Sequence, residues 1–350
     1  MPPPSSAESS SFDATRDALA QKCVRRLIDL NHQIRQQVID NRRPPSEMAG
    51  VERSDEADTI YAIDAVVEPA VEAVCEEWGK ETPLLLIAEG ILNEKGEEGG
   101  KTFPAGTKEE DCEIRVIVDP IDGTRGLMYD KRPAWALAAV APNNGPNTML
   151  RDCIASVMTE LPTSKMGFAD TLYATPGSGA KCERTDLRTG EVTTYEPRPS
   201  PVKQIDHGFA QVSDFFPGTK VLAGELMETI VAKLIGKADV TRATVFEDQY
   251  ISTGGQWYEL ICGRDRFNAD LRPEFYRLQG QLEGLCCHPY DCAGLLIAEE
   301  AGIILTDHKG QPLDGPLDLT TGISWMGYAN ESLREQIEPI ILEFLSREAK

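Results

Sequence analysis

The feature that most constrains the fold is a pair of aspartates directly after an apolar run. Residues 114–118, Ile-Arg-Val-Ile-Val, form a short β-rich segment, which predicts a strand that ends at Asp119. Pro120 fixes φ and cannot extend a β-ladder, so we expect the chain to turn there. Such a turn aims Asp119, Asp122 and the carbonyl of Ile121 at one point, and oxygen ligands of this kind suit Mg²⁺. The segment therefore predicts a divalent-cation site at the end of a strand.

The next two residues, Gly123 and Thr124, extend this prediction from a cation to a phosphate. Glycine allows a tight backbone, and a helix that begins there presents free N–H groups to an anion. Carboxylates for a cation beside N–H groups for an anion are the arrangement used in metal-assisted phosphate hydrolysis. The alternative is a solvent-exposed turn, because Asp-Pro and Asp-Gly pairs are common in turns. The motif by itself leaves both interpretations open.

Apolar residues along the rest of the chain recur at helical spacing in some segments and form short β-rich runs in others, which predicts a mixed α and β class. We expect a disordered Pro/Ser-rich tail over residues 1–12, an N-terminal lobe over 13–195 with most of the metal ligands, and a C-terminal lobe over 196–350. The polar loop at 94–110 should be mobile, and the segment 181–220 is rich in turn formers. Helices are expected at 13–43, 63–78, 224–235, 249–262, 292–301 and 333–347, and strands at 84–88, 114–118, 134–141, 154–159, 171–175 and 303–305.

Composition limits the partners and the compartment. Asp and Glu number 57 against 35 Lys and Arg, for a net charge of −22, so neither a nucleic-acid polymer nor an anionic membrane is an expected partner. Nine cysteines, an odd number without a Cys-x-x-Cys pair, favour reduced thiols over a disulfide framework or a zinc site. No segment approaches the roughly 18 apolar residues of a membrane span, and the Pro/Ser-rich start lacks the basic and apolar parts of a secretory signal. We expect a soluble, cytoplasmic protein.

Several segments also carry, in the same order, the motifs of one enzyme family. Residues 117–124 match an apolar run followed by D-P-[IVL]-D-G-[TS], and Tyr-Asp-Cys-Ala-Gly at 290–294 is similar to W-D-x-A-A-G. Weaker likenesses lie at 58–64, 87–90, 174–180, 298–303 and 306–313, and together they extend over about residues 14–345. On these motifs the sequence resembles the inositol monophosphatase-like superfamily, which comprises Mg²⁺-dependent, lithium-sensitive phosphatases with a fructose-1,6-bisphosphatase-like fold. The sequence departs from the pattern at Gly90, where the family has a second acid, and at Tyr290, where it has Trp.

The resemblance implies an α+β fold, a layered α-β-α-β-α sandwich of the inositol monophosphatase and sugar phosphatase type. It implies hydrolysis of a small phosphate monoester, either inositol monophosphate-like or a sugar phosphate, by direct attack of a metal-activated water. Two or three Mg²⁺ ions and a homodimeric assembly are also implied. By matched position, the metal ligands would be Glu89, Asp119, Asp122, Asp291 and the carbonyl of Ile121. Asp122, Gly123, Thr124 and Asp291 would bind the phosphate or the substrate, and Glu89, Thr124 and Asp64 would act in catalysis, the last two by orienting the attacking water.

Alternatives remain open at this point. Residues 125–127, Arg-Gly-Leu, resemble the nucleotide 3′-phosphatase branch, which makes a 3′(2′),5′-bisphosphate nucleotidase the alternative reaction. A non-catalytic, acidic cation-binding protein on the same fold is the second alternative, because fold alone does not determine function. The single acids have structural alternatives as well: Glu89 as a cap of a loop, Asp291 as a helix N-cap and Asp64 as a solvated acid.

Overall fold

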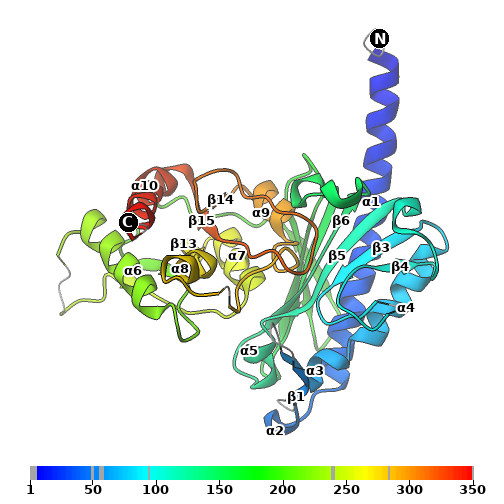
Figure 1. The fold of residues 1–350 in the computed structure, drawn as a ribbon, viewed down its shortest axis with the longest axis horizontal. Helices are drawn as coiled ribbons and strands as arrows, with labels where there is room; N and C mark the ends of the chain where they lie inside the picture. The colour runs from blue at the N-terminus through cyan, green and yellow to red at the C-terminus, as the bar shows by residue number, and fades with distance from the viewer. Residues whose placement is uncertain are drawn as a thin grey trace.

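Two β-sheets alternate with layers of helices in the computed structural model (Figure 1), which describes residues 6–48, 51–54, 59–93, 95–237, 241–282 and 284–348. The helices are α1 (Ser6–Asp40), α2 (Pro45–Met48), α3 (Ala62–Ala65), α4 (Glu68–Gly79), α5 (Thr124–Met128), α6 (Lys220–Leu234), α7 (Thr253–Ile261), α8 (Arg272–Leu278), α9 (Leu295–Ala301) and α10 (Glu331–Glu348). The strands are β1 (Val51–Ser54), β2 (Thr59–Tyr61), β3 (Leu84–Ala88), β4 (Lys101–Phe103), β5 (Ile114–Asp122), β6 (Ala134–Pro142), β7 (Ala155–Leu161), β8 (Phe168–Ala174), β9 (Lys181–Asp186), β10 (Val192–Tyr195), β11 (Gly208–Val212), β12 (Val245–Phe246), β13 (Asp265–Asp270), β14 (Ile304–Asp307) and β15 (Trp325–Tyr328).

The larger sheet has eight strands in the order β10-β9-β8-β7-β6-β5-β3-β4. β3 and β5 run parallel, and the other neighbouring pairs are antiparallel. β3, β5, β6 and β7 are buried along almost their whole length, because α1 packs on one face of the sheet and α7 and α9 pack on the other. Burial on both faces explains why β3 and β6 are continuous apolar runs rather than alternating ones.

The smaller of the two layered sheets has the order β12-β11-β13-β15-β14, and β1 and β2 form a separate antiparallel pair. β12, β11 and β13 are parallel, and β15 lies antiparallel between β13 and β14. Residues within a few positions of the ends of β5 in the larger sheet, and of β11 and β13 in the smaller one, line a common pocket. The carboxyl ends of strands from both sheets therefore meet there, which is where open α/β sheets bind their ligands.

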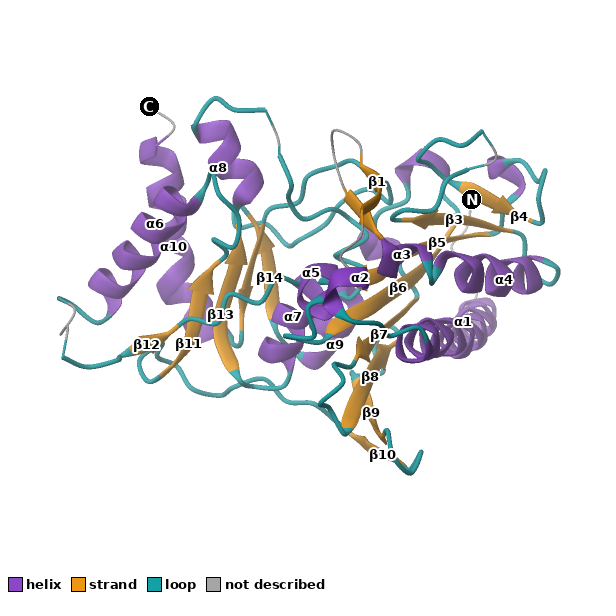
Figure 2. Cartoon of the chain, turned by 90° about the horizontal axis from the view of Figure 1, so that it is seen from below, coloured by secondary structure: helices purple, strands orange, loops and turns teal. Residues whose placement is uncertain are grey.

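The layers follow the order helix, sheet, helix, sheet, helix, and the predicted α-β-α-β-α sandwich is confirmed (Figure 2). α1 and α4 pack together and cover the larger sheet, α7 and α9 lie between the sheets, and α6 and α10 pack together against the smaller sheet. One apolar cluster lies between α1, α4 and the larger sheet, with Trp78 in it. A second fills the space between the two sheets and continues to α10; it contains Trp135, Trp257 and Trp325. The last strand of the larger sheet ends at Tyr195.

α1 places the predicted apolar stripe against the larger sheet. Asn31 interrupts this stripe, and its Nδ2 donates to the carbonyls of Ala136 at 3.0 Å and Val157 at 3.3 Å, which satisfies the donor end of a fully buried amide. The helix begins at Ser6, within the range 1–12 that was expected to be a tail, and residues 1–5 lie outside the described residues. Serine, alanine and glutamate after the proline run are compatible with the first turns of a helix. The stripe consists of Cys23, Leu27, Leu30, Ile34 and Val38.

Other boundaries differ from the prediction for local reasons. The helix expected at 63–78 is divided into α3 and α4, because Pro69 is in the first turn of α4 and begins a new helix. The loop expected at 94–110 contains β4, which pairs with β3. β13, α8 and β15 were not predicted; β13 reads Asp-Arg-Phe-Asn-Ala-Asp, and its polar residues hide the strand pattern.

The nine cysteines are free. Among the described helices, none has both the length and the apolar composition to cross a membrane.

Candidate functional site

The Asp-Pro-Ile-Asp segment forms a β-bulge at the carboxyl end of β5. Between Asp119 and Asp122, β5 has one residue more than its neighbour β6. The backbone N–H of Ile121 turns back to donate to Asp119 Oδ1 at 3.0 Å. A bulge tolerates Pro120, since a ladder donor is not required at that position. The expected turn at Pro120 is therefore wrong, and β5 continues to Asp122.

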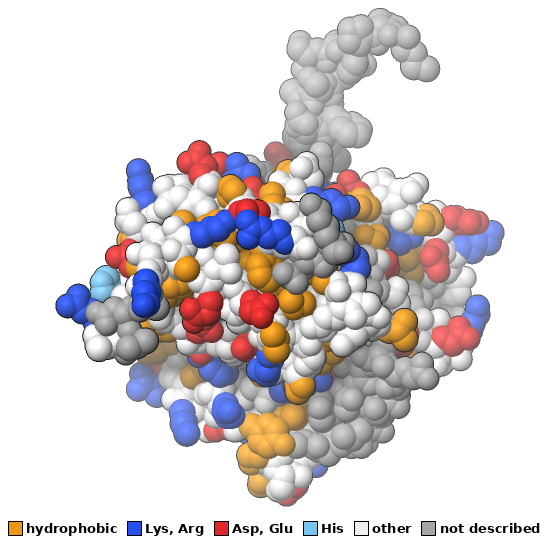
Figure 3. Space-filling model, turned by 60° about the vertical axis from the view of Figure 1, so that its left-hand side comes forward, with side chains coloured by type: hydrophobic (Ala, Val, Ile, Leu, Met, Phe, Trp, Pro, Cys, Tyr) orange, Lys and Arg blue, Asp and Glu red, His pale blue; other side chains and the backbone are white. Residues whose placement is uncertain are grey.

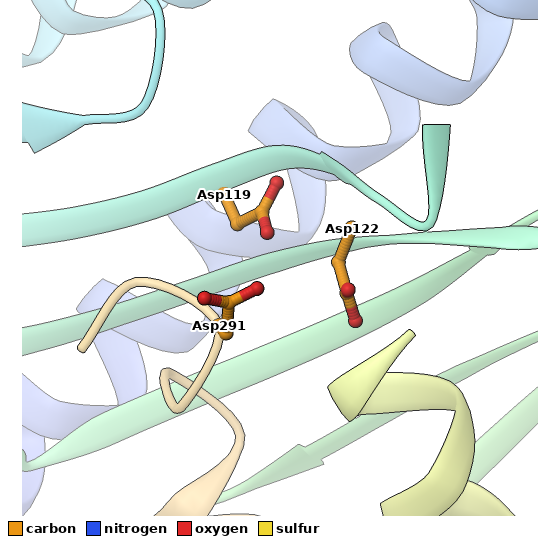
Figure 4. Close-up of side chains that lie close together, drawn as sticks. All are labelled: Asp119, Asp122 and Asp291. Atoms are coloured by element: carbon orange, nitrogen blue, oxygen red, sulfur yellow. The ribbon is translucent and has the colours of Figure 1, made fainter. Parts of the chain in front are cut away.

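Three aspartates meet at this bulge, Asp119 and Asp122 from β5 and Asp291 from the turn before α9 (Figure 4). One carboxylate oxygen of each lies within 4.8 Å of the other two. Asp119 is 1% exposed, and its Oδ2 is buried without a hydrogen-bond partner. Burial raises the pKa of Asp119 well above its usual range, and the charges of Asp122 and Asp291 raise it further. Such a group is stable only when it binds protons or a cation.

Asp122 also holds the N-terminus of α7. Its Oδ2 accepts from Ser252 Oγ at 2.8 Å and from Gly254 N at 2.6 Å, and its Oδ1 accepts from Thr253 N at 3.2 Å. In Figure 4 its carboxylate points toward this yellow helix. The first N–H groups of a helix favour an anion. Burial raises the pKa of Asp122 to about 6, and the three hydrogen bonds limit that rise. The sequence expectation missed this contact, because the predicted helix began at residue 249 instead of Thr253.

Asp291 is oriented by the backbone before it. Its Oδ2 accepts from the N–H of His288 at 2.6 Å. The N-cap of α9 is Gly294, so the alternative interpretation of Asp291 as a helix N-cap is wrong. Burial raises the pKa of Asp291 well above its usual range, the charge of Asp122 raises it further, and the His288 hydrogen bond opposes both. Asp291 therefore shares the electrostatic environment of the two aspartates on β5.

Glu89 and the carbonyl of Ile121 complete the predicted ligand set, and both line the same pocket. Glu89 is half-buried directly after β3, and a hydrogen bond from its carboxyl group, which requires Glu89 to be protonated, lowers the pKa of Asp119. It lies outside the group of three whose oxygens are within 4.8 Å of one another. The Ile121 carbonyl accepts from Thr124 Oγ1 at 2.8 Å. The structure thus brings all five predicted ligands to one pocket, with three of them in close contact.

Thr124 and Asp64, which come from distant parts of the sequence, are in direct contact. Thr124 Oγ1 lies 3.0 Å from Asp64 Oδ1, and Thr124 is the first residue of α5 while Asp64 lies in α3. Gly123 before it has φ +96°, and a Cβ there would come within 3.0 Å of the Ile251 carbonyl oxygen and of Ser252 Cβ. Only glycine fits such a position. Asp64 is therefore not merely a solvated acid, because its carboxylate is hydrogen-bonded to the residue that follows the bulge.

The smaller sheet contributes a side of the pocket that the sequence did not predict. Phe215 and Phe216 follow β11, and Arg272 follows β13. Arg272 Nε lies 2.9 and 3.0 Å from the two carboxylate oxygens of Asp270, and its guanidinium carbon lies 4.9 Å from the ring centroid of Phe215. The guanidinium carbon of Arg125 lies 5.2 Å from the ring centroid of Phe216. The only available sequence pattern was the Asp-x-Arg spacing, which is too common to identify a site.

The donor set fits a divalent cation. Three carboxylates, one with a buried unpaired oxygen, provide the hard oxygen ligands that Mg²⁺ prefers. The charge on Arg272 lowers the pKa values of Asp122 and Asp291 but does not reverse the effect of burial. A cation is therefore the group that best compensates the excess negative charge here.

Comparisons with known proteins find solved structures that resemble this chain, but no match at the level of sequence. No protein-family model matches the sequence, and no curated protein sequence matches it. The extragenic suppressor protein suhB from Bartonella henselae has a TM-score of 0.59 at 17% identity, over 91% of this chain and 98% of that one. An IMPase from Thermotoga maritima has a TM-score of 0.56 at 16% identity, over 92% and 97%. A fructose-1,6-bisphosphatase from Leishmania major, in holo form, has a TM-score of 0.62 at 14% identity, over 99% and 100%. At these identities the likeness concerns the fold.

Proposed function

Because the chain has the fold of the inositol monophosphatase and fructose-1,6-bisphosphatase-like proteins, we propose that it is a Mg²⁺-dependent phosphatase that hydrolyses a small phosphate monoester. The observation that carries the proposal is the buried, unpaired Oδ2 of Asp119 beside Asp122 and Asp291. These three carboxylates would hold the cation, with Glu89 beside them in the pocket. When bound, Mg²⁺ lowers the pKa of a coordinated water and neutralises charge on the phosphoryl oxygens.

The chain's own residues orient the attacking water and the phosphate. The Thr124 hydroxyl has one proton, which it donates to Asp64 or to the Ile121 carbonyl, so its oxygen is left to accept a proton from a water molecule in the pocket. The N–H groups of Gly123 and Thr124 hold phosphate oxygens at the start of α5. In this arrangement water attacks the phosphorus directly, in line with the leaving oxygen.

The Thr124–Asp64 pair favours a phosphatase over a non-catalytic cation-binding protein. Neither side chain belongs to the group of three close aspartates, and the Thr124 hydroxyl is not needed to hold a cation. A neutral hydroxyl fixed by a carboxylate beside a cation site is suited to orienting a nucleophile. Inositol and sugar phosphates are the substrates that the sequence resemblance implies.

The test is phosphate release from a panel of phosphate monoesters by the purified chain, with Mg²⁺ and with EDTA. We expect turnover that requires Mg²⁺ and that is lost in Asp291→Asn. Turnover that ignores Mg²⁺ would refute the metal mechanism. Tight Mg²⁺ binding by calorimetry without turnover of any ester would instead support the cation-binding alternative. Asp111→Asn is the matched control. Asp111 is an exposed acid three residues before β5, so this variant should keep full activity.

A further inference from the structure

A second cavity lies beside α3 and α5, the two short helices that carry Asp64 and Thr124. Its volume is about 360 Å³, within the usual range for small-molecule sites, and residues of α1, α2, α3, α5 and the loop after β7 line it. We propose that this cavity is an effector site for a small amphipathic acid, in which a carboxylate is joined to an unbranched apolar chain. Binding of this acid does not depend on the proposed phosphatase function, whereas its effect on turnover rests on that function.

The floor of this cavity is apolar and is shared among four helices. Its five side chains are each at most 6% exposed. α2, α3 and α5 have only four or five residues each, too few to be stable as isolated helices, so their positions depend on the packing of these side chains. An apolar chain that packs against this floor gains roughly fourfold in affinity for each methylene it buries. The floor consists of Val38, Met48, Ile63, Leu127 and Met128.

Three cations line the same cavity, and they are not neutralised by the fold. They are Arg42, Arg43 and Lys165, and among the residues that the structure describes no acid forms an ion pair with any of them. This local excess of positive charge stands against a chain with 57 acids and 35 Lys and Arg. On the face drawn in Figure 3, by comparison, acids and cations are mixed over the upper part of the surface. The cavity therefore attracts an anion.

The acid that also lines the cavity, Asp130, is already engaged. Its Oδ1 accepts from the Ser164 N–H at 2.7 Å, and its Oδ2 accepts from the Ser164 hydroxyl. These hydrogen bonds hold the pKa of Asp130 below its usual range, and the charges of Arg42 and Lys165 lower it further. Asp130 is thus close to these two cations without forming an ion pair with either, and the three cations outnumber it.

The charged part of the cavity is formed before any ligand arrives. Asp130 has φ +53°, a left-handed conformation that is costly for a residue other than glycine, and its bonds to Ser164 hold it there. The same bonds fix the residue that precedes Lys165. Arg42 Nη2 donates to the carbonyl of Pro162, which joins the end of α1 to the same loop. A carboxylate that binds here therefore orders little of the chain, which favours affinity.

The floor also connects the cavity to the residues that orient the attacking water. Ile63 precedes Asp64 in α3, and Leu127 and Met128 belong to α5, which begins at Thr124. A chain packed on these three side chains adds contacts to both helices, in the arrangement in which Thr124 Oγ1 donates to Asp64 Oδ1 at 3.0 Å. A ligand shifts a population toward the arrangement that it binds better. The acid is therefore an activator that acts on kcat.

Calorimetry on the full chain in EDTA tests the binding, because EDTA removes any cation that could hold a carboxylate at the three aspartates. The probes are octanoate, hexanoate and octan-1-ol. Octanoate should bind about tenfold more tightly than octan-1-ol, which lacks the charge, and about tenfold more tightly than hexanoate, which lacks two methylenes. Equal affinity for octanoate and octan-1-ol, or no binding of octanoate, would overturn the site.

A double variant locates the carboxylate. Arg43→Gln with Lys165→Gln changes two exposed side chains and should weaken octanoate about tenfold or more, with octan-1-ol unchanged. Lys181→Gln with Lys309→Gln is the matched control, since it removes the same charge from two exposed lysines outside the cavity, and it should bind octanoate like the unaltered chain. An equal loss in both double variants would show an effect of net charge and contradict the site.

Kinetics with Mg²⁺ test the coupling. Saturating octanoate should raise kcat for a phosphate monoester about fivefold and change KM by less than about twofold. A rise in KM with kcat unchanged would place octanoate at the three aspartates and overturn the effector role. No turnover of any ester would refute the proposed function, while calorimetry still decides on the cavity. Sedimentation with phosphatidylglycerol vesicles, lost in the Arg43→Gln, Lys165→Gln variant and without binding of octanoate, would assign the cavity to a membrane surface instead.

Discussion

Two buried aspartates, one at the strand end of each sheet, show how differently this chain uses the same side chain. Asp119 at the bulge of β5 and Asp270 at the end of β13 are each 1% exposed. Asp270 accepts from Arg272 through two nitrogens of the guanidinium and from its backbone N–H. Asp119 accepts from the Ile121 N–H at Oδ1, and its Oδ2 has no partner. Asp270 is therefore compensated by a counter-ion within the fold, whereas Asp119 is buried beside other acids, and we expect it to take up a proton or a cation.

The contrast teaches that burial alone does not mark a functional acid. What distinguishes Asp119 is that its close neighbours are Asp122 and Asp291, so that the local charge is unbalanced. The following substitutions test this distinction, from the largest expected effect to the smallest.

Asp119→Asn should separate activity from stability. We expect Mg²⁺-dependent phosphate release to fall by about a thousandfold or more, because several kcal/mol of charge stabilisation in the transition state depend on the bound cation. The same substitution removes a buried like charge, so in EDTA the free energy of unfolding should rise by about 1–2 kcal/mol. Steady-state kinetics and urea unfolding measure the two effects. An equal loss of both would show that Asp119 is a structural acid like Asp270.

Asp270→Ala should lower the stability of the chain, which Asp119→Asn should raise. It leaves the Arg272 guanidinium buried without a counter-ion, and we expect a loss of about 3–5 kcal/mol of stability in urea, with and without Mg²⁺. The double variant Asp270→Leu with Arg272→Met removes both charges and should recover most of that loss. If Asp270→Ala is as stable as the unaltered chain, the proposed difference between the two aspartates does not hold.

Thr124→Val tests a residue that lies beside the three aspartates but is not itself a predicted cation ligand. Loss of the hydroxyl should lower kcat by about a hundredfold, as for removal of a group that positions a nucleophile or its proton. Mg²⁺ binding, followed by calorimetry, should stay within about twofold, and Thr124→Ser should recover most of kcat. A parallel loss of Mg²⁺ affinity would place Thr124 among the ligands instead.

The smallest effect concerns pH. The folded-state pKa of Asp122 is raised to about 6, and those of Asp119 and Asp291 are raised as well, so the metal-free folded chain keeps protons that the unfolded chain releases near pH 4. Their contribution to stability is therefore present at low pH and is lost as pH rises through about 6. Mg²⁺ competes with these protons.

The rise in melting temperature on adding Mg²⁺ should therefore be about 2–4 °C larger at about pH 7.5 than at about pH 5. Thermal scans at both pH values measure it. Asp119→Asn should show a smaller difference between the two, and an equal Mg²⁺ effect at both pH values in the unaltered chain would contradict the raised pKa values.

The sequence predicted the larger sheet well, and the reason is physical. β3, β5 and β6 are buried on both faces, so each is an apolar run that periodicity identifies, and Asp119 and Asp122 stand out at the end of one. The bulge was not predictable, because Pro120 fits a turn and a bulge equally well. The resemblance placed Asp64 and Asp291 near that strand end, although they lie far from it in the sequence.

The smaller sheet and its part of the pocket could not be predicted in the same way. β13 carries polar residues whose partners come from elsewhere, such as Asn268, whose Nδ2 donates to the carbonyl of Gln256 in α7 at 3.2 Å. The contact of Asp122 with Ser252 joins residues more than a hundred positions apart. Such contacts depend on how the two sheets pack, and a single sequence contains no local pattern for them.

The hydrogen bonds between Asp122 and the N-terminus of α7 have a practical consequence. Trp135 lies opposite Asp122 in the β5–β6 register, and Trp257 lies one turn into the helix whose first N–H groups Asp122 holds. Both indoles are completely shielded from water. A cation that draws on the Asp122 carboxylate changes the electric field at both rings. We therefore expect the proposed cation binding to change the tryptophan emission of the chain, which can be measured without a label.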